Sequence, residues 1–206
     1  EPRLGTNDDL KALFDAAHAR GMRVLLDLVP NHWSNQHPTF QHAQQHADSP
    51  YREWYIWREW PDDYETFGTV QEMPKLNLAR HGPAREHLLE AAEHWLRQGA
   101  DGYRIDHAHG PPPDFYADLR RCCRAVKPDC WLFGEVTEGP DYQRGYASGL
   151  DGNLDFLLCH ALRDTFASGS WDVAQLAGLL DAHGDYFPSD FTRPSFFDNH
   201  DMERFL

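Results

Sequence analysis

Helix-type and strand-type segments alternate along most of this chain. The polar stretch "TNDD" precedes "LKALFDAAHAR", which predicts a capped helix that stops at Gly21. The next run, "MRVLLDLV", is short and apolar and is bounded by turn residues, as is typical of a strand buried on both faces. Pro83 then begins a second predicted helix, which ends at Gly99 and leads into the strand "GYRID". This alternation predicts an α/β fold in which helices pack outside a parallel sheet.

The same pattern continues to the end of the chain, with one interruption. We expect a further helix in "DFYADLRRCCRAV", strands in "CWLFGEV", "GNLDFLL" and "PSFFDNHD", and a helical region over residues 160–183. Residues 33–76 interrupt the pattern, because they are aromatic and polar and have no helix–strand rhythm. An irregular stretch of this length inside a compact domain is usually functional or forms a small subdomain.

The composition limits the possible partners. The chain has 33 Asp and Glu residues against 19 Lys and Arg residues, and no basic patch stands out. We therefore expect no binding to nucleic acid or to an anionic membrane, and no apolar run approaches the length of a membrane span. The four cysteines form no CxxC pair, which favours free thiols and a cytoplasmic location.

Polar side chains collect where four of the predicted strands end. These side chains are Asn31 and His32 after "DLVP", Asp106 at the end of "GYRID", Glu135 in "LFGEV", and His200 and Asp201 at the end of "SFFDNHD". In parallel α/β folds, ligands bind at the carboxyl ends of the strands. The four strand ends together therefore predict a functional site at that edge.

Two interpretations of "DGYRIDHAHG" are open on the residues alone. His107 and His109 form an H-x-H pair that could hold a metal, if other strand ends supplied further ligands. Strand alternation, however, places Arg104 and Asp106 on one face of the sheet, where a fixed cation would oppose a metal ion. The arginine would instead keep Asp106 ionised, as a nucleophile requires.

Glu135 fits the role of a second, different carboxyl group. It ends the apolar strand "WLFGE", where loss of solvent favours the protonated form. A carboxyl that is protonated near neutral pH can act as a general acid. An ionised and a protonated carboxyl together are the signature of glycoside hydrolysis, in which Asp201 would supply a third carboxylate near the sugar.

These motifs resemble those of the α-amylase family of glycoside hydrolases (family 13). "DLVPNH", "GYRID", "GEV" and "FFDNHD" resemble its four conserved regions in the right order, and "MPKLN" at residues 73–77 resembles a fifth. The resemblance is nearest to the neopullulanase, cyclomaltodextrinase and oligo-1,6-glucosidase branches. It implies a (β/α)8 TIM barrel, of which residues 1–206 form a part, about strands 3 to 7, with residues 33–76 as a short inserted domain B.

The resemblance also implies a retaining glycosidase or transglycosylase that acts on α-glucosidic bonds of maltooligosaccharides or related α-glucans through a covalent glycosyl-enzyme. The implied catalytic residues are Asp106 as nucleophile, Glu135 as general acid/base and Asp201 as transition-state stabiliser. Among the implied substrate-binding residues, Arg104 would orient Asp106, and His32 and His200 would hydrogen-bond the sugar.

No cofactor is expected beyond the calcium ion that many members of this family bind. Gly110 removes the side chain that helps to hold that ion, so we expect no metal site although Asn31 is present. The alternatives are a metal-dependent barrel hydrolase that uses His107 and His109, and a non-catalytic relative. An α-glucan or oligosaccharide is the one partner expected, and the sequence sets no oligomeric state.

We expect these 206 residues to be a piece of a longer catalytic domain, because the first, second and eighth strands of the barrel have no counterpart here. A partial barrel leaves open sheet edges and an exposed core. Expressed alone, the 206 residues should aggregate and should release no measurable sugar from maltotriose, whereas a chain extended at both ends should be active. Equal specific activities of the two proteins would contradict this expectation.

Overall fold

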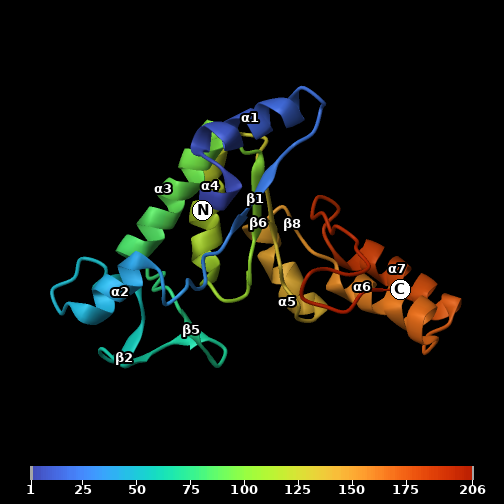
Figure 1. Ribbon diagram of the computed structural model, residues 1–206. Coiled ribbons are helices and arrows are strands. Elements are labelled where there is room, and N and C mark those ends of the chain that lie inside the picture. Colours follow the sequence, from blue (N-terminus) through green and yellow to red (C-terminus); the bar gives the residue numbers. More distant parts are fainter. Residues whose placement is uncertain (1, 206) are drawn as a thin grey trace. The chain divides into compact units, whose positions relative to one another are not determined.

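The computed structural model describes residues 2–205 and divides into two compact units, Glu1–Trp131 and Leu132–Leu206 (Figure 1). In the first unit, strands β1 (Leu25–Leu28) and β6 (Gly102–Ile105) pair in parallel. Helices α1 (Asn7–His18), α3 (Pro83–Gln98) and α4 (Pro113–Val126) accompany these strands, and α3 packs against α4. The α/β class predicted from the alternation is therefore confirmed.

Local signals in the sequence set the ends of these helices. Thr6 caps α1, because its hydroxyl accepts a hydrogen bond from the Asp9 amide while the Asp9 carboxylate accepts one from the Thr6 amide. Pro83 occupies the first turn of α3, and Gly99 ends that helix with a φ of 124°. The predicted starts and stops of both helices are thus confirmed.

The inserted segment between β1 and α3 forms its own small packing core. Its elements are helix α2 (Pro38–Gln45), the 3-10 turn η2 (Arg52–Trp54), the hairpin of β2 (Trp57–Glu59) and β3 (Asp63–Tyr64), and the hairpin of β4 (Thr66–Phe67) and β5 (Val70–Pro74). Phe40 lies at its centre, stacked on Trp57 with 5.5 Å between ring centroids and edge-on to Tyr55 and Tyr64. Aromatic packing therefore holds this segment together.

Strand β7 (Trp131–Gly134) leads from Trp131 into the second unit, where Phe133 and Gly134 pair in parallel with β8 (Gly152–Asn153). The helices of this unit are α5 (Pro140–Gly145), followed by the 3-10 turn η3 (Tyr146–Ser148), then α6 (Phe156–Arg163), which continues into a π-helical turn at Asp164–Ser168, and α7 (Val173–Tyr186). A capping box at Asp172 and Gln175 fixes the start of α7.

Two predicted strands of this unit are wrong in extent. "GNLDFLL" is a strand only at Gly152–Asn153, because the Asp155 carboxylate accepts a hydrogen bond from the Leu158 amide and so starts helix α6. "PSFFDNHD", which the structure describes in full, forms no strand. The Pro194 carbonyl accepts a backbone hydrogen bond from the Asp155 amide. The Phe197 carbonyl accepts from the Arg163 side chain instead of from a neighbouring strand.

Two expectations about the chain as a whole can be compared with the structure. All four cysteines are free thiols, as expected. Within residues 2–205, no helix is both long enough and apolar enough to cross a membrane.

A buried carboxylate anchors the beginning of β6. Asp101 is only 3% exposed, and it accepts hydrogen bonds from the His18 ring, the Lys127 ammonium group and the Val24 amide at 2.8, 2.5 and 2.7 Å. Burial alone would raise the pKa of Asp101, but these bonds outweigh it and lower the pKa to about 2. This carboxylate therefore joins α1, β1 and the residue after α4 to the start of β6.

We predict that Asp101→Asn lowers the free energy of unfolding of the full-length protein by about 3 kcal/mol at pH 7, because it removes one partner of a buried ion pair. The folded pKa lies below the unfolded value of about 3.9, so the stabilisation is present above that value and is lost as the pH falls toward 2. Denaturant titrations at several pH values between 7 and 2 should show that the difference in free energy of unfolding between the wild-type protein and Asp101→Asn becomes smaller as the pH falls. Asp129→Asn, which breaks an exposed pair with Arg23, is the control and should change stability little.

Candidate active site

The side chains of Arg104 and Asp106 meet where β6 ends. The Arg104 guanidinium donates from one nitrogen to the Asp106 carboxylate at 2.6 Å and to the Asp27 carboxylate of β1 at 2.9 Å. The Arg104 side chain is 15% exposed and that of Asp106 is 25% exposed, so the pair is largely shielded from water. The prediction that alternation places these two residues on one face is confirmed.

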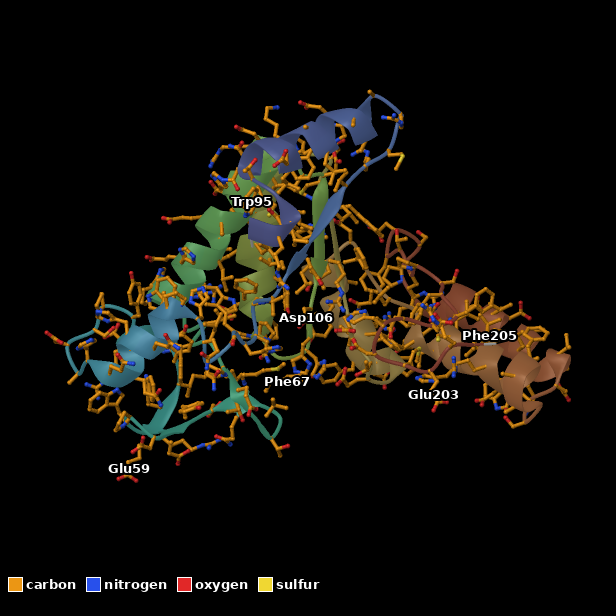
Figure 2. All side chains as sticks on the ribbon, viewed as in Figure 1. Glu59, Phe67, Trp95, Asp106, Glu203 and Phe205 are labelled. Atoms are coloured by element: carbon orange, nitrogen blue, oxygen red, sulfur yellow. The ribbon has the colours of Figure 1, made fainter. Side chains whose placement is uncertain are left out.

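His32 lies beside this pair at the end of β1, and it is joined to His107 through one aromatic ring. Phe67 of β4 stacks on His32 at 4.6 Å between centroids, and its edge meets His107 at 4.5 Å. The two imidazole rings are themselves 6.4 Å apart. Figure 2 shows Asp106 and Phe67 near the end of β6. The inserted segment therefore contributes an aromatic side chain to the surroundings of Asp106.

Both imidazoles are kept neutral near pH 7. Burial lowers the pKa of His32, although the nearby Asp106 carboxylate opposes that change. Burial also lowers the pKa of His107 to about 4, with the neighbouring His109 adding to the effect. His107 has a φ of 44°, a left-handed conformation that costs about 1–2 kcal/mol in a residue with a Cβ. The chain thus turns sharply directly after Asp106.

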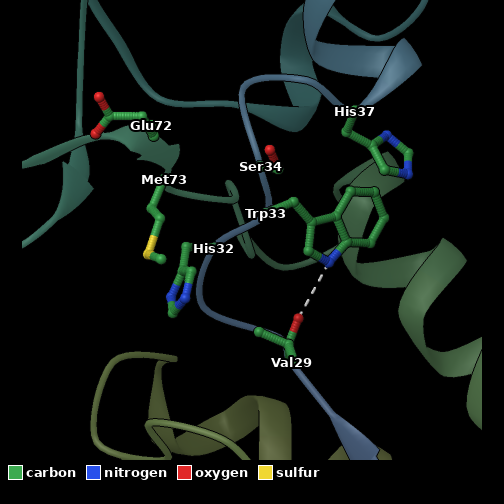
Figure 3. Close-up of a pocket in the computed structure, with 7 residues that line it drawn as sticks. All are labelled: Val29, His32, Trp33, Ser34, His37, Glu72 and Met73. Atoms are coloured by element: carbon green, nitrogen blue, oxygen red, sulfur yellow. Dashed lines mark hydrogen bonds between the residues drawn. The ribbon is translucent and has the colours of Figure 1, made fainter.

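An open pocket of about 490 Å³ lies on another side of His32 (Figure 3). Its walls come from the end of β1 and from the inserted segment, and the residues that line it are Val29, His32, Trp33, Ser34, His37, Glu72 and Met73. The Trp33 indole is fixed by a hydrogen bond to the Val29 carbonyl at 3.1 Å. Backbone bonds from Trp33 to Pro74 and from Asn35 to Glu72 hold the two walls together. His32 therefore borders both Asp106 and this pocket.

The remaining candidate residues lie in the second unit. Glu135 directly follows β7, at the carboxyl end of that strand. His200 and Asp201 are neighbours whose side chains approach to 3.1 Å, and both are exposed. The structure thus gathers Arg104, Asp106 and His32 in one unit, and it gathers His200 with Asp201 in the other, which also carries Glu135.

Sequence reasoning missed two residues of the first group. Asp27 is a carboxylate inside the apolar run "LLDL", and in the parallel register it lies opposite Arg104. An acidic residue within an otherwise apolar strand run is a signal for a cationic partner, although the Asp27 side chain itself is 57% exposed. Phe67 carries no such signal, because its contact with His32 and His107 depends on how the inserted segment folds back.

The calcium ion that many members of the resembled family bind does not fit the donors near Asn31. The side-chain oxygen of Asn31 is buried and lacks a hydrogen-bond partner among the described residues, which is the one feature that favours a cation. The pocket of about 310 Å³ beside it is lined by Lys75 but by no carboxylate. Calcium takes about six to eight oxygen ligands, usually with carboxylates among them. An ammonium group beside the amide side chains of Asn31 and Asn77 does not make such a site.

The alternative metal site on His107 and His109 also lacks a ligand set. The two rings are close, with 3.8 Å between centroids. Over residues 2–205, however, no group of three or more His, Cys, Asp or Glu side chains is arranged to hold a metal ion. A catalytic zinc would require about three protein ligands, so the geometry favours the carboxylate interpretation of this strand end.

Parallel strands with polar side chains at their carboxyl ends, each followed by a helix, define the class of α/β barrel enzymes that this chain resembles. Comparison with known proteins gives the family. The model of the α-amylase catalytic domain matches residues 1–206, and the chain belongs to the α-amylase family. It is part of the (β/α)8 barrel of that family, so the predicted fold class and resemblance are confirmed.

Individual relatives cover the chain almost completely. An α-amylase of Dictyoglomus thermophilum, named α-amylase 2, is 39% identical over all of this chain, which spans 36% of that protein. A solved cyclomaltodextrinase is 32% identical, with a TM-score of 0.90 over 99% of this chain and 36% of its own. The solved cyclic α-maltosyl-(1→6)-maltose hydrolase of Arthrobacter globiformis is 27% identical, with a TM-score of 0.85 over 93% of this chain and 44% of its own.

We predict that Gly110→Ala destabilises the full-length protein by about 1–3 kcal/mol, a typical cost of overpacking a filled site. A Cβ at this position would overlap the side-chain oxygen of Asn31 and would lie 2.8 Å from the His107 ring. Thermal unfolding should therefore shift to lower temperature. Gly145→Ala is the matched control, because a Cβ there meets nothing within 4 Å and the melting temperature should not fall. Equal melting temperatures for the two variants would refute the close contact.

Proposed function

We propose that the protein containing this chain is a retaining glycosidase or transglycosylase that acts on α-glucosidic bonds of maltooligosaccharides or related α-glucans. The observation that carries the proposal is the Arg104–Asp106 pair at the carboxyl end of β6. An arginine that donates to one carboxylate oxygen forms a charge-assisted bond with the group and fixes its direction. A fixed, ionised carboxylate is what a nucleophile toward an anomeric carbon requires.

In the proposed reaction, a carboxylate oxygen of Asp106 bonds to the anomeric carbon while the bond to the leaving oxygen breaks. Glu135 gives its proton to that oxygen and then takes one from the water or sugar hydroxyl that releases the glycosyl group. Asp201 stabilises the positive charge that develops on the ring. Retention of configuration requires the carboxyls of Asp106 and Glu135 to stand about 5–5.5 Å apart.

The neutral imidazoles near Asp106 support this chemistry. The transition state of glycoside cleavage resembles an oxocarbenium ion, which carries positive charge. A protonated imidazole close to that charge would oppose it, whereas the neutral rings of His32 and His107, whose pKa values burial lowers, add no such repulsion. His32, and by the same proposal His200, would then hydrogen-bond the sugar.

The substrate class rests on the relatives. The relatives are named α-amylase, cyclomaltodextrinase and cyclic α-maltosyl-(1→6)-maltose hydrolase. We propose an α-glucan or oligosaccharide as the partner, with no nucleic acid or membrane involved. No calcium or other cofactor is part of the proposal. A cytoplasmic location is proposed from the four free thiols. The non-catalytic alternative is disfavoured because all three proposed catalytic carboxyls are present.

The test is Asp106→Asn in the full-length protein, supplied with maltotriose, cyclodextrin, pullulan and isomaltose. The variant should fold with an unchanged melting temperature or a small shift, and its turnover should fall by about 10⁴-fold or more, because no nucleophile remains. The wild-type protein should form a first product with the α configuration, observed by proton NMR before mutarotation.

Two outcomes would overturn the proposal. One is a first-formed product of β configuration, which would show inversion. The other is full activity of Asp106→Asn, which would exclude this carboxylate as the nucleophile. Glu135→Gln is the companion variant. Its loss of turnover should be smaller on aryl α-glycosides, whose leaving groups need no proton, than on maltotriose.

A further inference from the structure

The segment that carries His200 and Asp201 is closed at its base by one arginine. Arg163 is the last residue of α6, and a single guanidinium nitrogen donates to the carbonyl of Phe197 at 3.3 Å and to the carbonyl of Glu203 at 3.1 Å. These two carbonyls stand on either side of the five residues 198–202. The arginine therefore ties together both ends of the loop that presents Asp201 (Figure 2, where Glu203 and Phe205 are labelled).

Other bonds order the same loop from within. The Asp198 carboxylate accepts from the Arg204 guanidinium and from the Phe205 amide, each at 2.9 Å. The Asp201 amide donates to the Asn199 side chain, also at 2.9 Å. These contacts shape the loop, but each of them joins residues within the loop or just beyond it. Arg163 and the Cys159 thiol, at 3.4 Å from the Phe197 carbonyl, connect the loop to a helix.

From these contacts we propose that Arg163 is a positioning residue that fixes the Asp201 carboxylate in the geometry that catalysis needs. The inference rests on the proposed function, in which Asp201 stabilises the transition state. The direction of the Asp201 side chain is set by the backbone between residues 197 and 203, and α6 supplies the rigid support for that backbone.

An arginine suits this role for a chemical reason. A nitrogen of the guanidinium group carries two hydrogens in a fixed plane, so it can bridge two carbonyl oxygens at once. The group also keeps its charge at every relevant pH. Its positive charge helps to lower the pKa of Asp198, after the bonds from the Phe205 amide and from Arg204. A neutral side chain at position 163 would lose both the bridge and the charge.

The test compares Arg163→Met and Arg163→Lys in the full-length protein, with maltotriose as substrate. The methionine variant should lose about 10- to 100-fold in kcat, because small displacements of a catalytic group cost rates of that order. Its KM should change by less than about threefold, since Asp201 acts in the transition state. Lysine keeps a charge and several donors, so Arg163→Lys should recover part of the loss. Arg144→Met is the matched control, because Arg144 of α5 only lies over the Tyr186 ring, and it should leave kcat unchanged.

A double-mutant cycle with Asp201→Asn separates positioning from general structural damage. If Arg163 acts through Asp201, adding Arg163→Met to Asp201→Asn should cost almost nothing further in kcat on an aryl α-maltoside. An unchanged kcat in Arg163→Met, or an equal loss in both backgrounds, would overturn the inference. Full activity of Asp201→Asn alone would instead refute the proposed role of Asp201, so the two failures can be told apart.

Discussion

One guanidinium group holds two strands and two carboxylates in a fixed relation. Arg104 lies opposite Asp27 in the β1–β6 register and donates to Asp27 and to Asp106. Arg104 is largely shielded from water, so an unpaired charge there would be costly, and Asp106 and the more exposed Asp27 supply its partners. Because the register of the two strands determines whether they meet, the pairing of the sheet and the direction of the proposed nucleophile depend on each other. A slip of one residue would separate them.

The surroundings of that carboxylate are built from parts that are distant in sequence. The chain leaves β6 through a left-handed residue, His107, which turns its ring toward Phe67 of the inserted segment. Phe67 in turn stacks on His32 at the end of β1. An aromatic ring can contact two imidazoles without adding charge, and burial keeps both imidazoles neutral. The inserted segment therefore shapes the electrostatics beside Asp106 as well as its outline.

Most features that depend on neighbours in sequence were predictable, whereas contacts between residues far apart in the sequence were not. The capping residue Thr6 and the stop at Gly99 act within one helical turn, and both were expected from local chemistry. The length of "GNLDFLL" as a strand was overestimated, because the apolar run masked Asp155 as a helix cap. The strand expected in "PSFFDNHD" is absent, and its Phe197 carbonyl accepts from the distant Arg163 side chain. Asp27 was overlooked, since its role appears only when β1 and β6 are aligned.

Strand β6 lies between a carboxylate that stabilises the fold and a carboxylate that we propose to be catalytic. Asp101, just before it, binds groups from α1, from the start of β1 and from the residue after α4, whereas Asp106 follows directly after its last residue. The four residues of β6 thus separate Asp101, which stabilises the fold, from Asp106, the proposed nucleophile. Substitutions at the carboxyl edge can alter specificity while the contacts of Asp101 at the opposite end of the strand stay in place. This separation gives such a lineage freedom to diversify its substrates, and it makes that edge the natural place for directed evolution.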